Sequence, residues 1–300
     1  MDKNFKSGFV AIVGKPNVGK STLLNKILKQ KISIVSPKPQ TTRNKITGIY
    51  NTDDCQIVFL DTPGIHKAKN TLDKFMEKSI SSALEGIDCL VYMLDGLKNF
   101  DDEEIKQIEN YSKTNIPVIL VVNKTDESSY EKLYPKLAKL NSLSLVKEII
   151  PISAKVGNNV DVLLENILKF IPNGPCYYPQ DISSDKTEQF IVGEIIREKA
   201  LWLLNEEIPH GVAVLINSFK EQLNIVKIDA TIICEKESHK SIIIGANGSK
   251  LKKIAENSRK DMEKLLGKQV YLSIWVKVKE NWRDNDFQVS NLGYNIKNID

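Results

Sequence analysis

The sequence predicts an α/β fold in which a domain with a mostly parallel β-sheet is followed by a smaller α+β domain. In the first half of the chain, short apolar runs typical of buried strands alternate with helical stretches, which favours a parallel sheet. Residues 171–179 then hold three prolines and a glycine, which indicates a boundary. We expect domains at 1–173 and 188–282, a linker at 174–187 and a tail at 283–300.

The composition narrows the class of protein. A chain of 300 residues suggests about two domains, and its net charge of +4 is too small to indicate a partner by itself. The four cysteines lie far apart and the three histidines are scattered, so we expect reduced thiols and propose no metal cluster. No signal-peptide pattern opens the chain, and no apolar run reaches the roughly 18 residues that span a bilayer. We therefore expect a soluble protein.

The first motif is a glycine-rich loop between the apolar run at 9–13, a predicted strand, and the helical stretch at 22–28. Its glycines let successive N–H groups point at an anion, and the start of the helix adds the positive end of its dipole. Lys20 would reach the β- and γ-phosphates, and Ser21 would offer its hydroxyl to Mg²⁺. The loop alone does not separate ATP from GTP. Its sequence is Gly14-Lys15-Pro16-Asn17-Val18-Gly19-Lys20-Ser21.

An irregular loop follows, because Pro37 and Pro39 precede Gln40-Thr41-Thr42-Arg43. A threonine in this loop can bind Mg²⁺ and sense the γ-phosphate. Both Thr41 and Thr42 are candidates, and we favour Thr42.

Two predicted strands, 48–50 and 56–60, flank a turn, and the second runs into Asp61-Thr62-Pro63-Gly64. A carboxylate at the end of a buried strand can hold a water bound to Mg²⁺. Gly64 can present its N–H to the γ-phosphate because it has no side chain in the way. The run at 89–94 predicts another buried strand, and the acidic run at 101–104 predicts the first turn of an exposed helix.

The deciding motif is Asn123-Lys124-Thr125-Asp126, which follows the predicted strand at 117–122. Asp126 can accept hydrogen bonds from N1–H and the 2-amino group of guanine. Adenine lacks this donor pair, so ATP would leave a buried carboxylate unpaired. Lys124 would lie along the base and ribose, and Asn123 would tie this loop to the glycine-rich loop. After the strand at 149–152, the backbone of Ser153-Ala154-Lys155 can contact guanine O6.

These motifs all lie just past predicted strands, where parallel sheets bind ligands. Their order resembles that of P-loop GTPases of the translation-factor class. The predicted cofactors are GTP or GDP and Mg²⁺, with Ser21, Thr42 and Asp61 as metal ligands. The predicted nucleotide site comprises Gly14, Lys15, Pro16, Asn17, Val18, Gly19, Lys20, Ser21, Asp61, Thr62, Pro63, Gly64, Ile65, Asn123, Lys124, Asp126, Ser153, Ala154 and Lys155.

Hydrolysis needs an unusual device in this chain. Small signalling GTPases carry a glutamine directly after the Asp-x-x-Gly motif, and it orients the attacking water. That position is Ile65 here, which cannot hydrogen-bond. One hypothesis is a K⁺ ion held partly by Asn17; others are a partner that supplies the missing group, or Arg43 acting in cis. Slow intrinsic turnover follows from each, and Thr41, Thr42, Gly64 and Asn17 are the predicted switch or catalytic residues.

The sequence pattern of the second domain predicts an RNA-binding module. Thr187 is expected to cap a helix, and strands are expected at 211–216, 226–233 and 270–279. Between the last two strands, a Gly-x-x-Gly turn links two helices, the second predicted to be capped by Ser249. Residues 236–280 hold eleven basic and five acidic side chains. This order predicts a type II KH domain, whose predicted RNA-binding residues are Gly245, Ala246, Asn247, Gly248, Lys250, Lys252 and Lys253.

The polar tail holds three aromatic residues, Trp282, Phe287 and Tyr294. They can stack on bases or, as the more conservative interpretation, pin the tail to the domain.

The whole chain resembles the Era GTPase family through the motifs above and through Glu194-Ile195-Ile196-Arg197-Glu198-Lys199 and Trp275-Val276-Lys277-Val278-Lys279. The resemblance implies a bacterial ribosome-assembly GTPase that binds the 3′ end of 16S ribosomal RNA and the small (30S) subunit. It also implies a mainly cytoplasmic protein, with a peripheral fraction at the inner membrane. We expect a monomer.

The predicted mechanism couples the two domains: GTP orders the loops around Thr42 and Gly64, and this opens the Gly-x-x-Gly turn to RNA. Two alternatives remain. One is a membrane-associated or cell-cycle signalling GTPase whose second domain binds protein. The other is an RNA-binding structural factor with negligible turnover, which the residue Ile65 keeps open.

Overall fold

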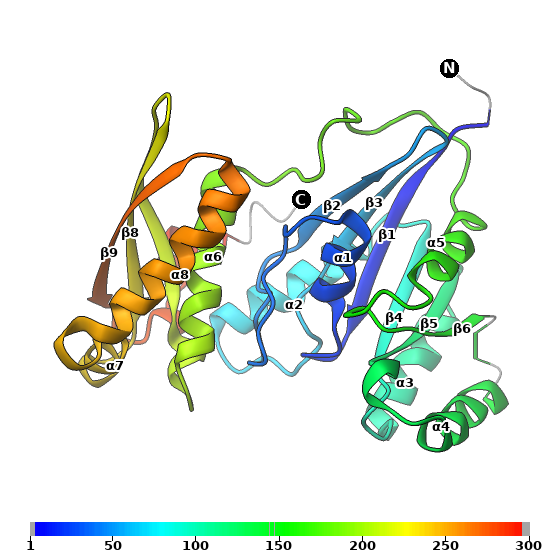
Figure 1. Cartoon of the computed structure of the whole chain (residues 1–300). Coiled ribbons are helices and arrows are strands. Elements are labelled where there is room, and N and C mark those ends of the chain that lie inside the picture. The colour runs from blue at the N-terminus through cyan, green and yellow to red at the C-terminus, as the bar shows by residue number, and fades with distance from the viewer. Residues whose placement is uncertain (1–3, 144, 147, 296–300) are drawn as a thin grey trace. The chain divides into compact units, whose positions relative to one another are not determined.

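The computed structural model describes residues 4–143, 145–146 and 148–295. The chain divides into two compact units, whose elements are labelled in Figure 1. The first unit holds the described residues up to Ser33, then Thr42–His66 and Ser79–Asp185. The second holds Ile34–Thr41, Lys67–Lys78 and the described residues from Lys186 onward. The division therefore differs from the predicted limits, since two short early segments group with the C-terminal unit.

The first unit is built on a six-stranded sheet in the order β2-β3-β1-β4-β5-β6 (Figure 1). Its strands are parallel except β2, which forms an antiparallel hairpin with β3. The mostly parallel sheet predicted from the sequence is thus confirmed. The elements from β1 to α5 are β1 (Lys6–Gly14), α1 (Lys20–Leu28), β2 (Ile46–Asn51), β3 (Cys55–Asp61), α2 (Thr71–Ala83), β4 (Cys89–Asp95), α3 (Asp102–Ser112), β5 (Val118–Asn123), η1 (Thr125–Glu127), α4 (Tyr130–Ser142), β6 (Glu148–Pro151) and α5 (Val160–Leu168).

Both faces of this sheet are covered. Four successive residues of β1, from Val10 to Val13, are fully buried, which requires packing above and below the strand. One cluster joins alternate strand residues to Ile108 of α3 and to Leu133 and Leu140 of α4. Helix α1 packs against β1, β2 and β3. The sheet is therefore a rigid support whose strands end in the predicted motifs.

The predicted linker is anchored to the first unit as far as Asp185. The side-chain oxygen of Gln56 accepts hydrogen bonds from the backbone N–H groups of Tyr177 and Tyr178 at 2.7 and 2.9 Å. The N–H of Ile49 donates to the carbonyl of Ser183 at 2.9 Å. These contacts explain why residues beyond the three prolines still belong to the first unit.

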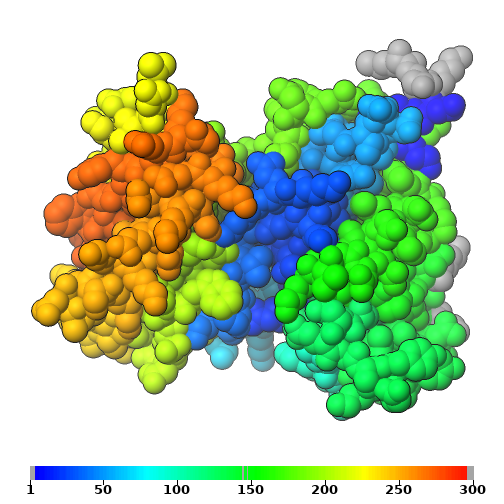
Figure 2. All heavy atoms as spheres, in the orientation of Figure 1, coloured from blue at the N-terminus to red at the C-terminus, as the bar shows by residue number. Residues whose placement is uncertain are grey.

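The C-terminal part of the second unit has a three-stranded sheet in the order β7-β8-β9, in which β8 pairs antiparallel with β7 and parallel with β9. Helices α6, α7 and α8 share one core with buried residues of this sheet, including Val226, Ile228 and Ala230. The tip of the β7–β8 hairpin projects from the unit (yellow in Figure 2). The elements are α6 (Glu188–Leu203), η2 (Ile208–Gly211), β7 (Ala213–Glu221), β8 (Ile225–Cys234), α7 (Glu237–Ile244), η3 (Ala246–Gly248), α8 (Ser249–Leu266), β9 (Gln269–Val278), η4 (Trp282–Asp284) and α9 (Asp286–Asn291).

The helix caps agree with the sequence in one place and differ in another. The Thr187 side chain accepts a hydrogen bond from the N–H of Phe190, so it caps α6 as predicted. The prediction that Ser249 caps α8 is wrong. Gly248 is the cap residue and Ser249 is the first helical residue, because only a glycine fits the left-handed turn at this point without strain.

None of the helices in the described part of the chain is long and apolar enough to cross a membrane.

Candidate nucleotide and RNA sites

The glycine-rich loop has the backbone that its sequence predicts. Gly14 has a φ of +147°, and a Cβ there would lie 2.4 Å from the Met93 carbonyl oxygen. Gly19 has a φ of +108° and precedes the first turn of α1. Both positions therefore require glycine.

The ammonium group of Lys20 is buried inside the loop. Its Nζ donates to the carbonyl oxygens of Gly14 and Lys15 at 2.8 and 2.9 Å. Burial lowers the pKa of Lys20 to about 8, although the nearby Asp61 carboxylate acts in the opposite direction. A buried cation hydrogen-bonded to two carbonyl oxygens fits an anion such as a phosphate.

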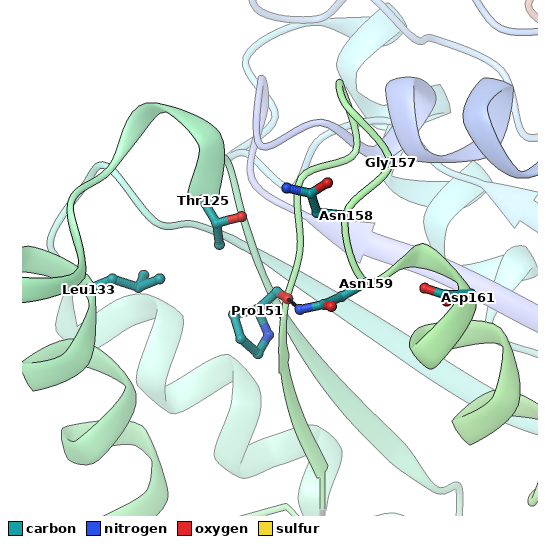
Figure 3. A pocket seen from close by; sticks show the side chains of 7 residues that line it. All are labelled: Thr125, Leu133, Pro151, Gly157, Asn158, Asn159 and Asp161. Atoms are coloured by element: carbon teal, nitrogen blue, oxygen red, sulfur yellow. Dashed lines mark hydrogen bonds between the residues drawn. The ribbon is translucent and has the colours of Figure 1, made fainter.

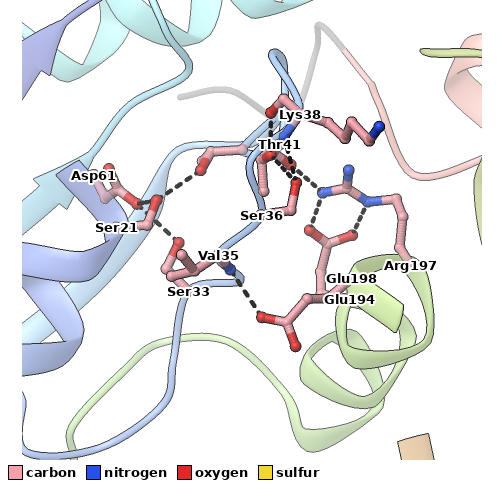
Figure 4. A network of polar contacts seen from close by, with 11 residues as sticks. Ser21, Ser33, Val35, Ser36, Lys38, Thr41, Asp61, Glu194, Arg197 and Glu198 are labelled. Atoms are coloured by element: carbon pink, nitrogen blue, oxygen red, sulfur yellow. Dashed lines mark hydrogen bonds and ion pairs between the residues drawn. The ribbon is translucent and has the colours of Figure 1, made fainter. Parts of the chain in front are cut away.

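Hydroxyl groups from three separate segments surround Asp61 at the end of β3 (Figure 4). Ser21 Oγ donates to Asp61 Oδ2 at 2.7 Å and lies 2.8 Å from Thr42 Oγ1. Ser33 Oγ, which the sequence did not single out, donates to the same carboxylate oxygen at 2.8 Å. The other oxygen, Oδ1, is buried and accepts no hydrogen bond from any residue that the structure describes.

These groups fit a Mg²⁺ ion. Hydroxyl and carboxylate oxygens are the ligands that this ion prefers, and the unsatisfied Oδ1 offers a further acceptor. Burial raises the pKa of Asp61, and a cation would counter this effect by stabilising its ionised form.

The structure separates the two threonine candidates. The hydroxyl of Thr41 lies 2.7 Å from Ser36 Oγ and donates to the Lys38 carbonyl at 2.6 Å (Figure 4). It is thus engaged within its own loop, whereas the hydroxyl of Thr42 contacts Ser21. The geometry favours Thr42 as the metal ligand.

The segment after β3 is fixed to the glycine-rich loop by its backbone. The Thr62 hydroxyl donates to the Ile12 carbonyl at 2.8 Å, and the N–H of Ile65 donates to the Gly14 carbonyl at 3.1 Å. A Cβ on Gly64 would lie 2.7 Å from Pro16, so this close approach requires glycine. The Ile65 side chain packs against the apolar core and offers no polar group to a water.

Asn123 links the two loops that the sequence assigns to it. Its Nδ2 donates to the Val18 carbonyl at 2.7 Å, and its Oδ1 accepts from the N–H of Ala154 at 2.9 Å. Lys124 Nζ contacts Asp95 Oδ2 at 2.7 Å. The sequence analysis missed Asp95, although its position at the end of β4 was a signal that it lies at the same edge of the sheet.

The residues predicted to contact the base differ in their exposure to solvent. Asp126 is exposed, whereas Ser153 and Ala154 are buried. Lys155 is exposed, and its Nζ lies 3.1 Å from Glu127 Oε1. The backbone of this loop and the Asp126 carboxylate can thus meet a guanine edge.

A hollow of about 590 Å³ adjoins these loops but is not the predicted base site (Figure 3). Asn159 Nδ2 crosses part of it to donate to the Pro151 carbonyl at 2.8 Å. The residues in its wall are Thr125, Leu133, Pro151, Gly157, Asn158, Asn159 and Asp161.

The acidic run has a structural role. Asp101 caps α3 and forms a capping box with Glu104, and Lys15 of the glycine-rich loop pairs with Asp101. The hydrogen bond from Lys15 lowers the pKa of the Asp101 carboxyl.

The Gly-x-x-Gly turn of the second unit has a backbone that needs its glycines. Gly245 and Gly248 have φ values of +74° and +75°, and the N–H of Gly248 donates to the Gly245 carbonyl at 3.1 Å. A Cβ on Gly245 would lie 2.8 Å from Lys250 Cβ, whereas one on Gly248 would meet open space. Lys252 and Lys253 are exposed on the first turns of α8. An RNA strand can therefore approach at Gly248.

Two of the three tail aromatics serve packing. Trp282 is fully buried, donates to the Gly211 carbonyl at 2.9 Å and stacks on Tyr294 with 6.0 Å between ring centroids. Both belong to an apolar cluster with Ala213 and Ile233. The conservative interpretation is thus confirmed for Trp282 and Tyr294, while Phe287 is 74% exposed.

Comparison with known proteins gives consistent results for both halves of the chain. A family model described as a 50S ribosome-binding GTPase matches residues 9–124, and a KH-domain model matches residues 207–283. GTPase Era from Clostridium botulinum (strain Kyoto / Type A2) is 51% identical over 97% of this chain and 98% of its own. GTPase Era from Clostridium tetani is 50% identical over 97% of this chain and 99% of its own.

Two solved structures are similar over nearly the whole chain. One is a crystal structure of Era in complex with MgGDPNP and nucleotides 1506–1542 of 16S ribosomal RNA. It has a TM-score of 0.93 and 40% identity, and the match covers 97% of this chain and 99% of the other. The second, Aquifex aeolicus Era bound to GDP·AlF4⁻, has the same TM-score and identity, with coverage of 97% and 100%.

The fold and the sites define a P-loop GTPase domain joined to a KH domain. Because the chain is 50–51% identical to Era proteins over 97% of its length, it belongs to the Era family of GTPases.

Proposed function

We propose that the protein is a GTP-hydrolysing switch that binds the 3′ end of 16S ribosomal RNA through its KH domain and acts in assembly of the small ribosomal subunit. The observation that carries the proposal is the cluster of Ser21, Thr42 and Asp61 beside the buried Lys20. A solved relative of the same family holds both MgGDPNP and 16S ribosomal RNA.

In this proposal, Ser21, Thr42 and Asp61 hold Mg²⁺, which would neutralise charge on the β- and γ-phosphates. Lys20 and the loop N–H groups bind the phosphates, and Gly64 presents its N–H beside the glycine-rich loop. Asp126 selects guanine, while Asn123 keeps the base loop and the glycine-rich loop in register.

Water positioning must come from something other than the side chain after Gly64, because Ile65 packs into the core. Asn17 is exposed and has a φ of +64°, so its side chain is accessible to an ion at the loop. We propose that K⁺ bound there supplies positive charge during hydrolysis. Equal turnover in K⁺ and Na⁺ would rule this out.

The loop that precedes Thr42 is held by α6 of the second unit (Figure 4). Arg197 Nη2 donates to the Thr41 carbonyl at 2.5 Å, Glu198 Oε1 accepts from the N–H of Val35 at 2.9 Å, and Trp202 Nε1 donates to the Val35 carbonyl at 3.0 Å. The peptide bond is planar, so fixing the Thr41 carbonyl also fixes the plane of the peptide that begins Thr42. These contacts support coupling between the nucleotide state and the RNA-binding unit.

The remaining partner assignments follow from the family. We propose a cytoplasmic monomer with a peripheral fraction at the inner membrane. A signalling GTPase whose second domain binds protein is the alternative, and it would not need the exposed lysines and glycine turn at the start of α8.

The test is a titration of a 16S 3′-end RNA into the protein with GTP analogue, GDP or no nucleotide, at several salt concentrations. Gly248→Asp is expected to weaken binding at least tenfold, because its carboxylate would repel the RNA backbone. Gly248→Asn is the matched control, since asparagine has a similar shape, tolerates positive φ and carries no charge. No loss in either variant would favour the protein-binding alternative, whereas equal loss in both would show that the added side chain, not its charge, disrupts RNA binding.

A further inference from the structure

One face of the sheet of the second unit is open except at the end where Ala213 and Ile233 lie in the apolar cluster with Trp282 and Tyr294. Residues that alternate along β8, such as Val226, Ile228 and Ala230, lie in the core shared with α6, α7 and α8. The residues between them face the other way. On the edge strand β9 these are Tyr271, Ser273, Trp275 and Lys277.

Two large aromatic side chains lie on this open face without cover. Trp275 is 66% exposed and Tyr271 is 62% exposed, although the buried Trp282 shows that the same unit can enclose a tryptophan. They are four positions apart on one strand, so they lie about 13 Å apart along it. Aromatic rings exposed together on a small sheet point to a ligand with flat apolar surfaces.

The side chains around these rings are mainly cationic. Lys227 is paired in register with Tyr271, Lys220 is paired with Lys227, and Lys277 follows Trp275 on the same face of β9. All three lysines are exposed, and none forms an ion pair with a residue of the described chain. Asp229 is the acidic residue of this face along β8. The face therefore attracts anions.

The surface is hollowed at the edge of the sheet beside Tyr271. A hollow of about 630 Å³ at the turn between α8 and β9 has Tyr271, Arg259 and Lys268 in its wall. Arg259 belongs to α8 on the covered side, whereas Tyr271 points to the open side. The two cations pair with the half-buried Glu263 and the exposed Glu221, and a phosphate can compete with both surface ion pairs.

We propose that this open face is a second binding surface for single-stranded RNA, in which bases stack on Trp275 and Tyr271 while Lys220, Lys227 and Lys277 contact phosphates. Unpaired bases can stack on aromatic rings, whereas bases inside a duplex cannot. A protein partner is less suited, because lysines are depleted at the centres of protein interfaces. The proposal rests on RNA being the ligand of this unit, but it does not require the Gly245–Gly248 turn.

The first experiment measures tryptophan fluorescence during titration with a 12-nucleotide single-stranded RNA. Stacking on Trp275 is expected to quench the emission of the parent protein, and Trp275→Ala is expected to remove that quenching. The titration is made in a Trp202→Phe background, because Trp202 is 56% exposed, whereas Trp282 is buried and cannot contribute. Quenching of equal size in Trp275→Ala would overturn the proposal.

The second experiment compares affinities for RNAs of 4 and 12 nucleotides. Trp275→Ala and Tyr271→Ala are each expected to weaken binding of the 12-nucleotide RNA about tenfold and to leave the 4-nucleotide RNA unaffected. Trp275→Phe should restore most of the loss, since phenylalanine can also stack. Leu223→Ala is the matched control, because Leu223 is 88% exposed at the hairpin tip of the same sheet.

The two RNA surfaces are distinguished by their variants. If the turn is the primary site, Gly248→Asp is expected to weaken binding of both RNAs. The sheet variants are expected to weaken binding of the longer RNA alone. Unchanged affinity of Trp275→Ala for the 12-nucleotide RNA would overturn the second surface alone. If the parent protein bound neither RNA, the proposed function would be overturned instead.

Discussion

Asp126 is the residue that we propose selects guanine over adenine. It is exposed, and Asn123 and Lys124 beside it are hydrogen-bonded to Val18 and Asp95. These bonds hold the loop in place while the carboxylate remains accessible to a base. A carboxylate can only accept hydrogen bonds, so its fit to guanine depends on two donors on the base.

Replacing the carboxylate by an amide should change this preference. Asp126→Asn is expected to weaken GTP and GDP binding about 100-fold, because two hydrogen bonds to a charged group are lost or inverted. Xanthosine triphosphate, which has a carbonyl where guanine has an amino group, should gain affinity. A fluorescent-nucleotide titration with both bases measures this exchange, and unaltered GTP affinity would show that Asp126 does not contact the base.

At the scale of elements, the turn between α7 and α8 depends on two glycines for different reasons. Gly245 lies against Lys250, so an added Cβ would clash at 2.8 Å, whereas Gly248 faces open space. Both have a positive φ, which costs an L-residue roughly 1–2 kcal/mol.

Gly245→Ala should therefore destabilise the second unit more than Gly248→Ala. We expect a loss of about 1 kcal/mol in the free energy of unfolding for Gly248→Ala, set by backbone strain alone. The loss for Gly245→Ala should be clearly larger because the clash with Lys250 adds to it. Chemical denaturation followed by circular dichroism measures both, and equal losses would contradict this account of the turn.

Helix α6 carries the contacts that hold residues 34–41. Arg197 is fully buried, pairs with Glu194 and donates to the Thr41 carbonyl. Removing Arg197 leaves the Glu194 carboxylate, whose side chain is 14% exposed, without its partner, so the expected cost lies below the roughly 3–5 kcal/mol of a fully buried pair.

Arg197→Ala is accordingly expected to release this loop. Cleavage by elastase after Val35 should become faster, and the affinity for a GTP analogue should fall while that for GDP changes little. The control is Lys38→Ala, because Lys38 forms an exposed hydrogen bond to Asn205 at 3.1 Å. Equal effects on the GTP analogue and GDP would indicate a general loss of stability rather than a role in positioning the loop.

At the scale of the whole molecule, nucleotide and RNA binding form one thermodynamic cycle. If the GTP state binds RNA more tightly than the GDP state, RNA must favour GTP over GDP by the same factor. The grouping of residues 34–41 and 67–78 with the second unit supports such a link.

Both sides of this cycle can be measured in the same buffer. RNA affinity is determined with GTP analogue and with GDP, and the affinities of both nucleotides are then determined with and without saturating RNA. The two ratios are expected to agree within error and to exceed about fivefold. Ratios of one on both sides would remove the coupling and leave two independent binding units.

Much of the fold was predictable because local sequence fixes local geometry. The glycine-rich loop, the strands that end at Asp61 and Asn123, and the order of elements in the KH domain could all be predicted from apolar runs and turn residues. The positions of the nucleotide motifs followed, because parallel strands bring their carboxyl ends to one edge of a sheet.

Local patterns were thus enough to predict both folds, the nucleotide motifs and the resemblance to Era proteins. Long-range packing settles which hydroxyl, that of Thr41 or that of Thr42, contacts Ser21, and which aromatic residues are covered. It also decided that residues 34–41 group with α6, far away along the chain. The reason is physical: periodicity and turn chemistry act between near neighbours, whereas burial depends on segments that meet only after folding.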